Sequence, residues 1–212
     1  MQRHLPLLDA LSTWQTRARQ RFPKIIPCRP GCSACCQGPF DIPTADVAVV
    51  LEGFRALPRD DRRAILTRAR ADVEAMRALV PGWIDPYDIA DIGEEAFDRA
   101  IESHADRPCP LLDDEGRCLI YAHRPVVCRI IGIGLLAESG SVLENECPIQ
   151  DRFPGYPGLP PYPFPLEQYE AKAEAANREA AEALLGDGDR HRFETTIAAA
   201  LVKWGAADEE AP

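Results

Sequence analysis

Eight cysteines divide this chain of 212 residues into two separate groups. The first group stands in the stretch "CRPGCSACC", residues 28–36, where four thiols occupy nine positions and the last two are adjacent. The second group is spread over residues 109–147, and the 72 residues between the groups contain no cysteine. Three explanations fit thiols at this density: disulfide bonds, a metal site or a reactive thiol. Any fold of this chain has to give both groups one of these roles.

The choice between disulfides and metal depends on the compartment of the protein, because thiols stay reduced in the cytoplasm. The N-terminal stretch contains Pro6 and Asp9 where an export signal would need an uninterrupted apolar core. The chain also contains no apolar run that approaches the ~18 residues of a membrane span. We therefore predict a cytoplasmic protein without membrane association, whose reduced thiols bind metal ions.

Length and charge limit the other classes of protein. A chain of this length is expected to form one domain, predicted here over residues 1–204, with the motif core at 25–150 and a frayed tail at 205–212. Such a domain can bury a hydrophobic core without support from disulfides. The net charge of −10 repels phosphate backbones, so we expect no nucleic-acid partner.

Hydrophobic residues recur at helical spacing through most of the chain. The segments with such a stripe, each expected to pack it against the core, are 7–22, 44–57, 60–80, 89–101, 166–184 and 193–204. Thr44 is the expected N-cap of the second of these helices, and Asp189 precedes the last one as its cap. The predicted fold is therefore mainly α: a helical domain with short β-hairpins around a cysteine-rich metal-binding core.

Short strands are expected only between residues 109 and 147. The stretch "CPLLDDEGRCLIY", residues 109–121, places two apolar runs around a turn at Gly116, which predicts one hairpin. Residues 130–144 predict a second hairpin that turns at Ser139-Gly140-Ser141.

The stretch "FPGYPGLPPYPFP", residues 153–165, is rich in proline. We expect it to run as an extended strap that Tyr156, Tyr162 and Phe164 hold against the domain. The alternative is that this loop is a binding surface for a protein partner.

Thiolates are soft ligands that select zinc, iron–sulfur clusters or copper(I). Four thiolates close a tetrahedral zinc site or hold a cluster fully. Because each group supplies four, the chain can form two sites or one multinuclear site that both groups share. We predict that all eight cysteines are metal ligands and that the two groups converge: Cys28, Cys32, Cys35, Cys36, Cys109, Cys118, Cys128 and Cys147. His104 and His123 are further candidates for a fourth ligand.

The first group has a backbone break at Pro30-Gly31, after which "CSACC" can form one turn of helix. Cys32, Cys35 and Cys36 would then share one face, and Cys28 would reach back from the preceding loop. Consecutive residues on a helix point about 100° apart. We therefore predict that Cys36 is directed to a neighbouring metal or left as a spare thiolate.

In the second group, "HRPVVCR" predicts a short helix with Pro125 in its first turn. Cys128 would then lie near a helix N-terminus, where a thiolate is stabilised. Four thiolates on Zn²⁺ leave a net charge of about −2. The arginines expected to offset this charge and to keep the thiols deprotonated are Arg29, Arg124 and Arg129.

Several motifs of the chain occur together in a recognisable order. They are "GCSACC" at 31–36, "CPLLDDEGRCLIYAHRPVVCR" at 109–129 and a later "CP" at 147–148. This order resembles the YkgJ-type cysteine-cluster family, a zinc- or iron-chelating domain, over about residues 25–150. The resemblance implies metal chelation, with zinc or iron as the cofactor. Relatives of that family include flagellin lysine-N-methylases, which implies methyl transfer as an alternative, but no methylase motif can be placed on this chain.

Other functions remain open beside a metal or iron–sulfur protein, and so does the question of whether the protein is an enzyme. A structural zinc module that binds a partner would need only four of the eight thiols. The spacing Cys-x3-Cys-x2-Cys in "CRPGCSAC" is used by radical-SAM enzymes, but the chain does not show the alternating strands and helices of their barrel. A thiol oxidoreductase would surround its cysteines with a thioredoxin-like βαβ unit, which the pattern does not predict.

Overall fold

The computed structural model describes residues 3–26, 29, 31–144 and 147–207, and it is built mainly from α-helices, as the sequence predicts. The α-helices are α1 (Leu5–Arg21), α2 (Thr44–Arg55), α3 (Arg59–Leu79), α4 (Glu94–Ser103), α5 (Val127–Ile130), α6 (Leu166–Leu185) and α7 (Ile197–Ala200). The last α-helix continues as a π-helix over Leu201–Gly205. Short 3₁₀-helices lie at Ile89–Asp91, Tyr121–His123, Gln150–Arg152 and Gly188–Arg190. Residues 208–212 of the predicted tail lie outside the described residues.

The strands are short and form two small sheets. They are β1 (Asp41–Pro43), β2 (Leu135–Leu136), β3 (Val142–Leu143), β4 (Tyr162–Pro163) and β5 (Glu194–Thr196). β1 and β5 pair antiparallel, whereas β2 pairs antiparallel with β3 and parallel with β4. The second predicted hairpin is therefore confirmed. The prediction that strands occur only between residues 109 and 147 is wrong, because β1, β4 and β5 find partners that are distant in the sequence.

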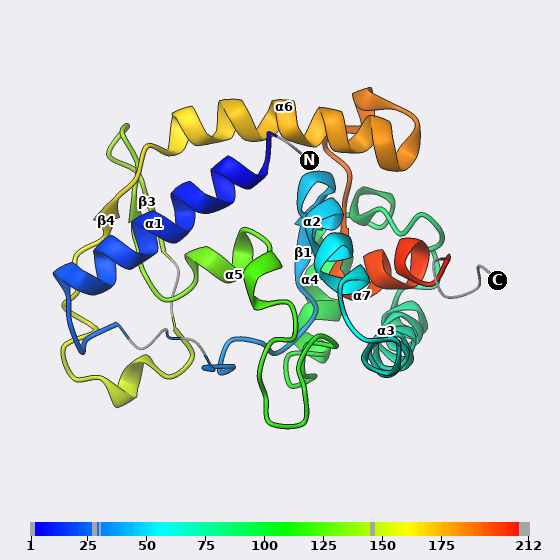
Figure 1. Ribbon diagram of the computed structural model, residues 1–212, viewed down its shortest axis with the longest axis horizontal. Helices are drawn as coiled ribbons and strands as arrows, with labels where there is room; N and C mark the ends of the chain where they lie inside the picture. The colour runs from blue at the N-terminus through cyan, green and yellow to red at the C-terminus, as the bar shows by residue number, and fades with distance from the viewer. Residues whose placement is uncertain (1–2, 27–28, 30, 145–146, 208–212) are drawn as a thin grey trace.

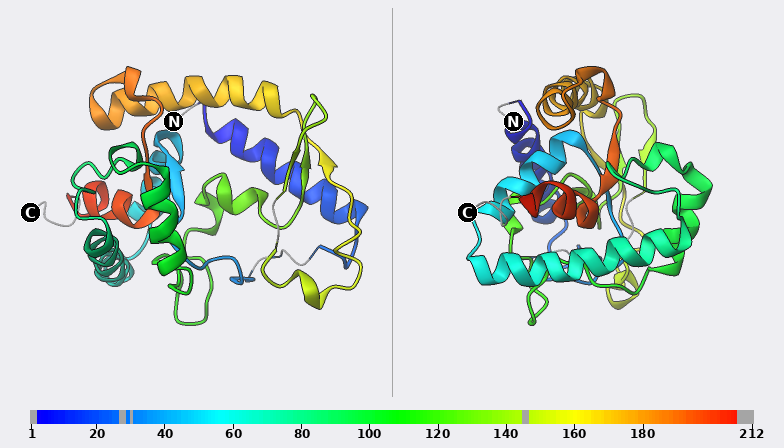
Figure 2. Two further views of the ribbon diagram at one scale, coloured as in Figure 1. Left: turned by 180° about the vertical axis from the view of Figure 1, so that it is seen from behind. Right: turned by 90° about the vertical axis from the view of Figure 1, so that its right-hand side faces the viewer.

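The helices gather in two regions of the molecule. Figure 1 shows α6 along one side with α1 beside it, and α2, α3 and α7 at the end opposite to β3 and β4. The short α5 lies between these regions, and Figure 2 shows the same arrangement from behind and α3 along its length. The chain segment that carries the second cysteine group therefore passes between two helical regions.

The predicted helical stripes form the hydrophobic core. In the larger cluster, α2, α3, α4, α7 and the π-helix bury large side chains that include Phe54, Leu51, Ile65 and Leu201, and Trp83 packs among them. A second cluster packs Leu11, Trp14 and Ala18 of α1 against residues from β2 and the strap. Burial of this apolar surface stabilises the fold, and the larger cluster consists mostly of residues from outside the two cysteine groups.

Two helix caps differ from the prediction. Thr44 is the first residue of α2, and its hydroxyl donates a hydrogen bond to the Asn177 backbone oxygen. The Asn177 side chain, which belongs to α6, accepts from the Ala45 backbone N–H at 3.1 Å and so caps α2 from outside. Thr196, not Asp189, caps α7, because its hydroxyl accepts from the Ala199 backbone N–H. A cap from a distant segment leaves no signal in the local sequence.

The proline-rich strap packs against the domain as predicted. Tyr156 and Phe164 are buried, and Tyr162 is half-buried beside Trp14, with ring centroids 6.3 Å apart. Part of the strap becomes β4. A protein partner for residues 153–165 stays a prediction. Among the described helices, none combines the length and the apolar character needed to cross a bilayer.

Gly53 allows a close approach between α2 and the 3₁₀-helix Tyr121–His123. A Cβ atom at Gly53 would lie 2.6 Å from the His123 Cβ and 3.0 Å from the Ile120 Cβ. We expect Gly53→Ala to lower the free energy of unfolding by about 1–3 kcal/mol through overpacking, although alanine favours helix by about 1 kcal/mol. Denaturant unfolding measures this. The control is Gly82→Ala, where the new Cβ meets no atom within 4 Å; equal effects of the two substitutions would contradict the prediction.

Candidate metal centre

The first cysteine group forms turns and not a turn of helix. The Cys32 backbone N–H donates to the Arg29 oxygen at 3.0 Å, and the Cys36 N–H donates to the Ser33 oxygen at 2.9 Å. The predicted helical turn over "CSACC" is therefore wrong, because the backbone closes two separate tight turns. Cys35 and Cys36 still lie close enough for their thiols to form a hydrogen bond. Cys28 lies outside the described residues.

Backbone pairing joins the first cysteine group to the second. The Cys109 N–H donates to the Cys36 oxygen at 2.9 Å, and the Gly38 N–H donates to the Arg107 oxygen at 2.7 Å. Between these two bonds, Gln37 and Pro108 form an antiparallel bridge. The two groups therefore meet in space although the cysteine-free segment separates them in sequence.

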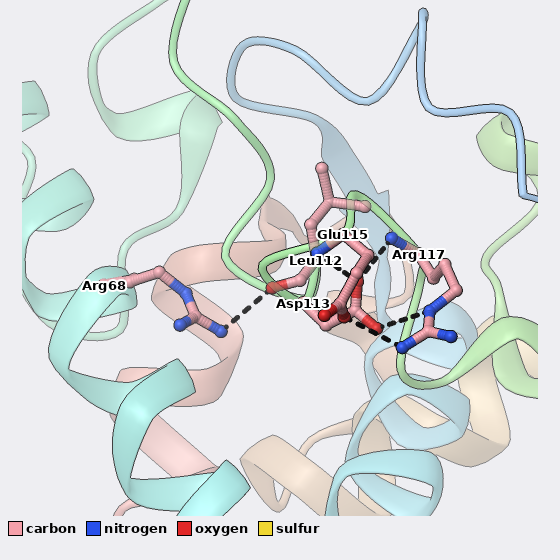
Figure 3. A network of polar contacts seen from close by, with 5 residues as sticks. All are labelled: Arg68, Leu112, Asp113, Glu115 and Arg117. Carbon is pink, nitrogen blue, oxygen red and sulfur yellow. Dashed lines mark hydrogen bonds and ion pairs between the residues drawn. The ribbon is translucent and has the colours of Figure 1, made fainter.

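The stretch from Cys109 to Cys118 forms the predicted turn but only one bridge of a hairpin, between Leu112 and Cys118. A regular hairpin would hold this stretch by several hydrogen bonds between its strands. Here the Arg68 guanidinium on α3 supplies hydrogen bonds to the backbone instead. It donates to the Pro110 oxygen at 2.9 and 3.1 Å. It also donates to the Leu112 oxygen at 3.1 Å (Figure 3). A charge-assisted bond of this kind is stronger than one between neutral groups, so Arg68 fixes the backbone between the two cysteines.

The tip of this turn is held by its own side chains. The Asp113 carboxylate accepts from the Arg117 and Glu115 backbone N–H groups and from the Arg117 guanidinium, and Arg117 also pairs with Glu115 (Figure 3). These bonds lower the pKa of the Asp113 carboxyl, and the backbone N–H of Arg117 has the largest effect. Gly116 has a φ of +75° at the tip, and a Cβ there would lie 3.1 Å from the Ser33 hydroxyl oxygen. The turn therefore packs directly on the first cysteine group.

Cys128 lies in the first turn of the short helix α5, near its N-terminus as predicted. Pro125 stands two residues before this helix and not within its first turn. The Val126 backbone N–H donates to the Asp46 carboxylate at 2.9 Å. Arg129 is buried and donates to the backbone oxygens of Ala122 and Arg124, both at 2.8 Å. Its guanidinium is therefore bound to the loop backbone.

One cavity of about 50 Å³ collects the thiols. A water molecule needs roughly 10–15 Å³, so the cavity has room for only a few water molecules. The cysteines that line it come from both groups: Cys32, Cys35, Cys36, Cys109, Cys118, Cys128 and Cys147. We call it the thiol cavity. The remaining wall is mostly apolar, with Arg29 and Arg124 as its charged residues.

Comparison with known families gives one match. The model of the family CxxCxxCC, described as "Putative zinc- or iron-chelating domain", matches residues 27–148, which is more than half of the chain and contains all eight cysteines. The chain belongs to this family. No curated protein and no solved structure matches it. The chain departs from the spacing in the family name at one point, because three residues and not two separate Cys28 from Cys32.

The donor set of this chelating domain fits a soft metal ion. Seven thiols line the thiol cavity, and among the described residues no Asp, Glu or His contributes to its wall. As they stand, no three Cys, His, Asp or Glu side chains in the described part of the chain are placed to hold one ion. A cysteine side chain reaches other positions by rotation about χ1 alone. Binding therefore requires the thiols to rotate toward a common point.

Burial keeps several thiols of the chelating domain protonated in the absence of metal. Desolvation raises the pKa of Cys109 to about 12, and it raises the pKa of Cys118 and Cys128 as well. The pKa of Cys35 is also raised, first by a hydrogen bond with Cys36 and then by burial. These side chains are only half-buried, but they border a narrow cavity that has little room for water. The prediction that the helix N-terminus and the arginines stabilise the thiolates of a metal site stays a prediction.

Arg124 is the charged residue best placed to face bound thiolates. Its guanidinium lies 3.7 Å from the centre of the Tyr121 ring and donates to the Tyr121 and Cys128 backbone oxygens. Its charge acts against the raised pKa of Cys35, Cys118 and Cys128. Stacking and hydrogen bonds thus hold a positive charge at the wall of the thiol cavity.

The two histidines do not line the thiol cavity. The His104 Nδ1 donates to the Ala100 backbone oxygen at 2.8 Å, and His123 packs against Gly53 of α2. Sequence reasoning also missed Arg68 and Asp46, which position the loops that carry the cysteines. Arg68 adjoins the buried stripe of α3, next to Ala69, but its partners lie 42 and 44 residues away in the chain.

Proposed function

We propose that this chelating domain binds zinc or iron in the thiol cavity, through cysteines of both groups. The observation that carries the proposal is the shared cavity: seven cysteines from two distant segments line it. Soft thiolate ligands favour zinc and iron over calcium or magnesium. We include Cys28 as an eighth ligand because its neighbour Arg29 lines the same cavity. When bound, the metal would be held by the thiolates after they release their protons.

The number of thiols supports more than one metal ion. Four thiolates complete a tetrahedral zinc site or hold an iron–sulfur cluster. The seven cysteines of the thiol cavity, with Cys28 as the proposed eighth ligand, therefore suit two neighbouring ions or one polynuclear cluster. The alternative, a structural module with a single zinc ion, would leave about four thiols free. Free thiols in the metal-loaded protein distinguish these possibilities.

Metal analysis of protein purified without oxygen, with zinc and iron both available, tests the proposal. We expect about two zinc ions per chain, or iron with the visible absorption of an iron–thiolate or iron–sulfur centre. Cys109→Ser and Cys128→Ser should each lower the metal content. Ala34→Ser places a serine on the same wall without removing a thiol, and it should bind normally. Protein without metal that titrates as eight free thiols would refute the proposal.

Substitution of Arg124 tests whether its positive charge stabilises the negatively charged metal–thiolate site. A four-thiolate zinc site has a net charge of about −2, so we expect Arg124→Gln to weaken zinc binding roughly fivefold, since an ion pair of this kind contributes up to about 1 kcal/mol. Arg124→Lys keeps the charge and should restore part of the affinity. Competition with a chromophoric chelator measures this. Equal affinities of the glutamine and lysine variants would show that the charge is unimportant.

A further inference from the structure

Helix α1 and its N-cap residue His4 lie outside the segment that matches the family, yet two polar contacts tie them to the loop that carries Cys128. The first contact runs through Asp46 of α2. One oxygen of this carboxylate lies 2.6 Å from the His4 Nε2 atom, and the other accepts from the Val126 backbone N–H at 2.9 Å. His4 and Asp46 are both buried, with exposed fractions of 2% and 0%.

The second contact runs through Arg129. Its guanidinium donates to the Ser12 hydroxyl of α1 at 2.5 Å, while its other N–H groups hold the Ala122 and Arg124 backbone oxygens. The Ser12 hydroxyl donates in turn to the Leu8 backbone oxygen. Each contact therefore joins α1, directly or through α2, to the backbone within a few residues of Cys128.

Apolar packing supports the same connection. α1 contacts α5, and Leu11 and Trp14 belong to the cluster against which Val126 and Ile130 pack.

A carboxylate accepts hydrogen bonds but cannot donate them, so the two oxygens of Asp46 can accept from His4 and from Val126 at the same time. Because an unpaired buried polar group is costly, loss of either partner from α1 weakens the fixed position of the loop.

We propose that α1 is a positioning element of the metal centre, in which His4 and Ser12 hold the Cys128 loop in place and thereby slow the release of bound metal. This inference rests on the proposed function. Neither residue contacts the thiol cavity, so both act through Asp46 and Arg129 and are positioning residues. Their effect is local to residues 122–130.

Variants of Ser12 provide a matched test. Ser12→Ala removes the hydroxyl that accepts from Arg129, and Ser12→Thr retains it. Thr16→Ala is the control, because Thr16 lies one turn further along α1, is exposed, and its hydroxyl donates to the Ser12 backbone oxygen within the helix. His4→Ala tests the other contact. We expect Ser12→Ala and His4→Ala to speed zinc transfer to a chromophoric chelator roughly tenfold, the effect of one lost buried hydrogen bond, while Ser12→Thr and Thr16→Ala leave it unchanged.

A second measurement separates this inference from the proposed function. In metal-free protein, the same two variants should speed amide exchange at Val126 and alkylation of Cys128 by iodoacetamide roughly tenfold, with unchanged exchange in α2 and α3. If the unaltered protein binds no zinc, the proposed function fails, but this measurement still decides whether α1 positions the loop. Ser12→Ala behaving like Thr16→Ala in both measurements would overturn the inference, and so would a uniform change across all helices.

Discussion

Amide exchange of residues 29–38 and 107–132 is expected to become about a thousandfold faster when metal is removed from the loaded protein. Metal present at a thousand times its dissociation constant stabilises the state that binds it by about 4 kcal/mol, which corresponds to this factor. The two segments contain turns, isolated bridges and the single turn of α5, so few of their hydrogen bonds support one another.

Helices α2 and α3 should keep their protection in the same experiment. Their buried residues share the larger hydrophobic cluster with α7 and the π-helix, and α2 also packs against α6. Cys109 and Cys118 only border this cluster, so its helical part does not depend on the metal. Hydrogen exchange read by mass spectrometry resolves the segments, and addition of zinc should restore the slow rates. Equal loss of protection in all helices would show that the metal supports the whole fold and not the cysteine loops alone.

The metal-free protein is expected to lose stability as the pH rises from about 9 to 12. The pKa of Cys109 rises from 9.0 to about 12 on folding because of burial, so the unfolded chain releases this proton first. Between pH 9 and pH 12 the Cys109 thiol is ionised in the unfolded chain but stays protonated in the folded protein. Ionisation therefore stabilises the unfolded state and lowers the free energy of unfolding. Three pH units correspond to about 4 kcal/mol for Cys109. The raised pKa values of Cys118 and Cys128 act in the same direction.

Metal should reverse this dependence on pH. Bound thiolates have already released their protons, so the affinity for metal falls as the pH decreases and protons compete for sulfur. Denaturant unfolding from pH 7 to pH 11, with and without zinc, measures both trends. Cys109→Ser should reduce the alkaline loss in the metal-free protein, and the part that remains comes from the other buried thiols. A metal-free protein that is equally stable at pH 8 and pH 11 would contradict the prediction.

The sequence predicts the helical stripes well because the period of a helix is a local property. The faces of α1, α3 and α6 are buried where the spacing of Leu11, Val73 and Ala180 indicates. The caps of α2 and α7 and the sheet of β1 and β5 were missed or misplaced. The partners of α2 and of β1 lie more than a hundred residues away, as Asn177 does from Ala45. The cap of α7 is local, because Thr196 directly precedes this helix, and it was misplaced because α7 begins later than the hydrophobic stripe indicates.

In the candidate site, too, the sequence predicts some features and misses those that depend on contacts between distant segments. The meeting of the two cysteine groups follows from thiol chemistry, because soft metals need several sulfurs together, and the shared cavity confirms that they meet. The geometry within each group could not be derived. A hydrogen bond from Val126 to Asp46, 80 residues earlier, sets the position of Cys128, and burial sets the protonation of the thiols.

The bond between Cys36 and Cys109 closes a loop of 72 residues before any ion arrives. Closing a loop of this length costs about 4 kcal/mol in chain entropy, and the helices packed within it offset that cost. An ion held by one group therefore meets the other at a high effective concentration. If the proposed function holds, the two groups would act as a single multidentate chelator, and a competing ligand would have to displace the sulfurs one after another while the remaining sulfurs keep hold of the ion.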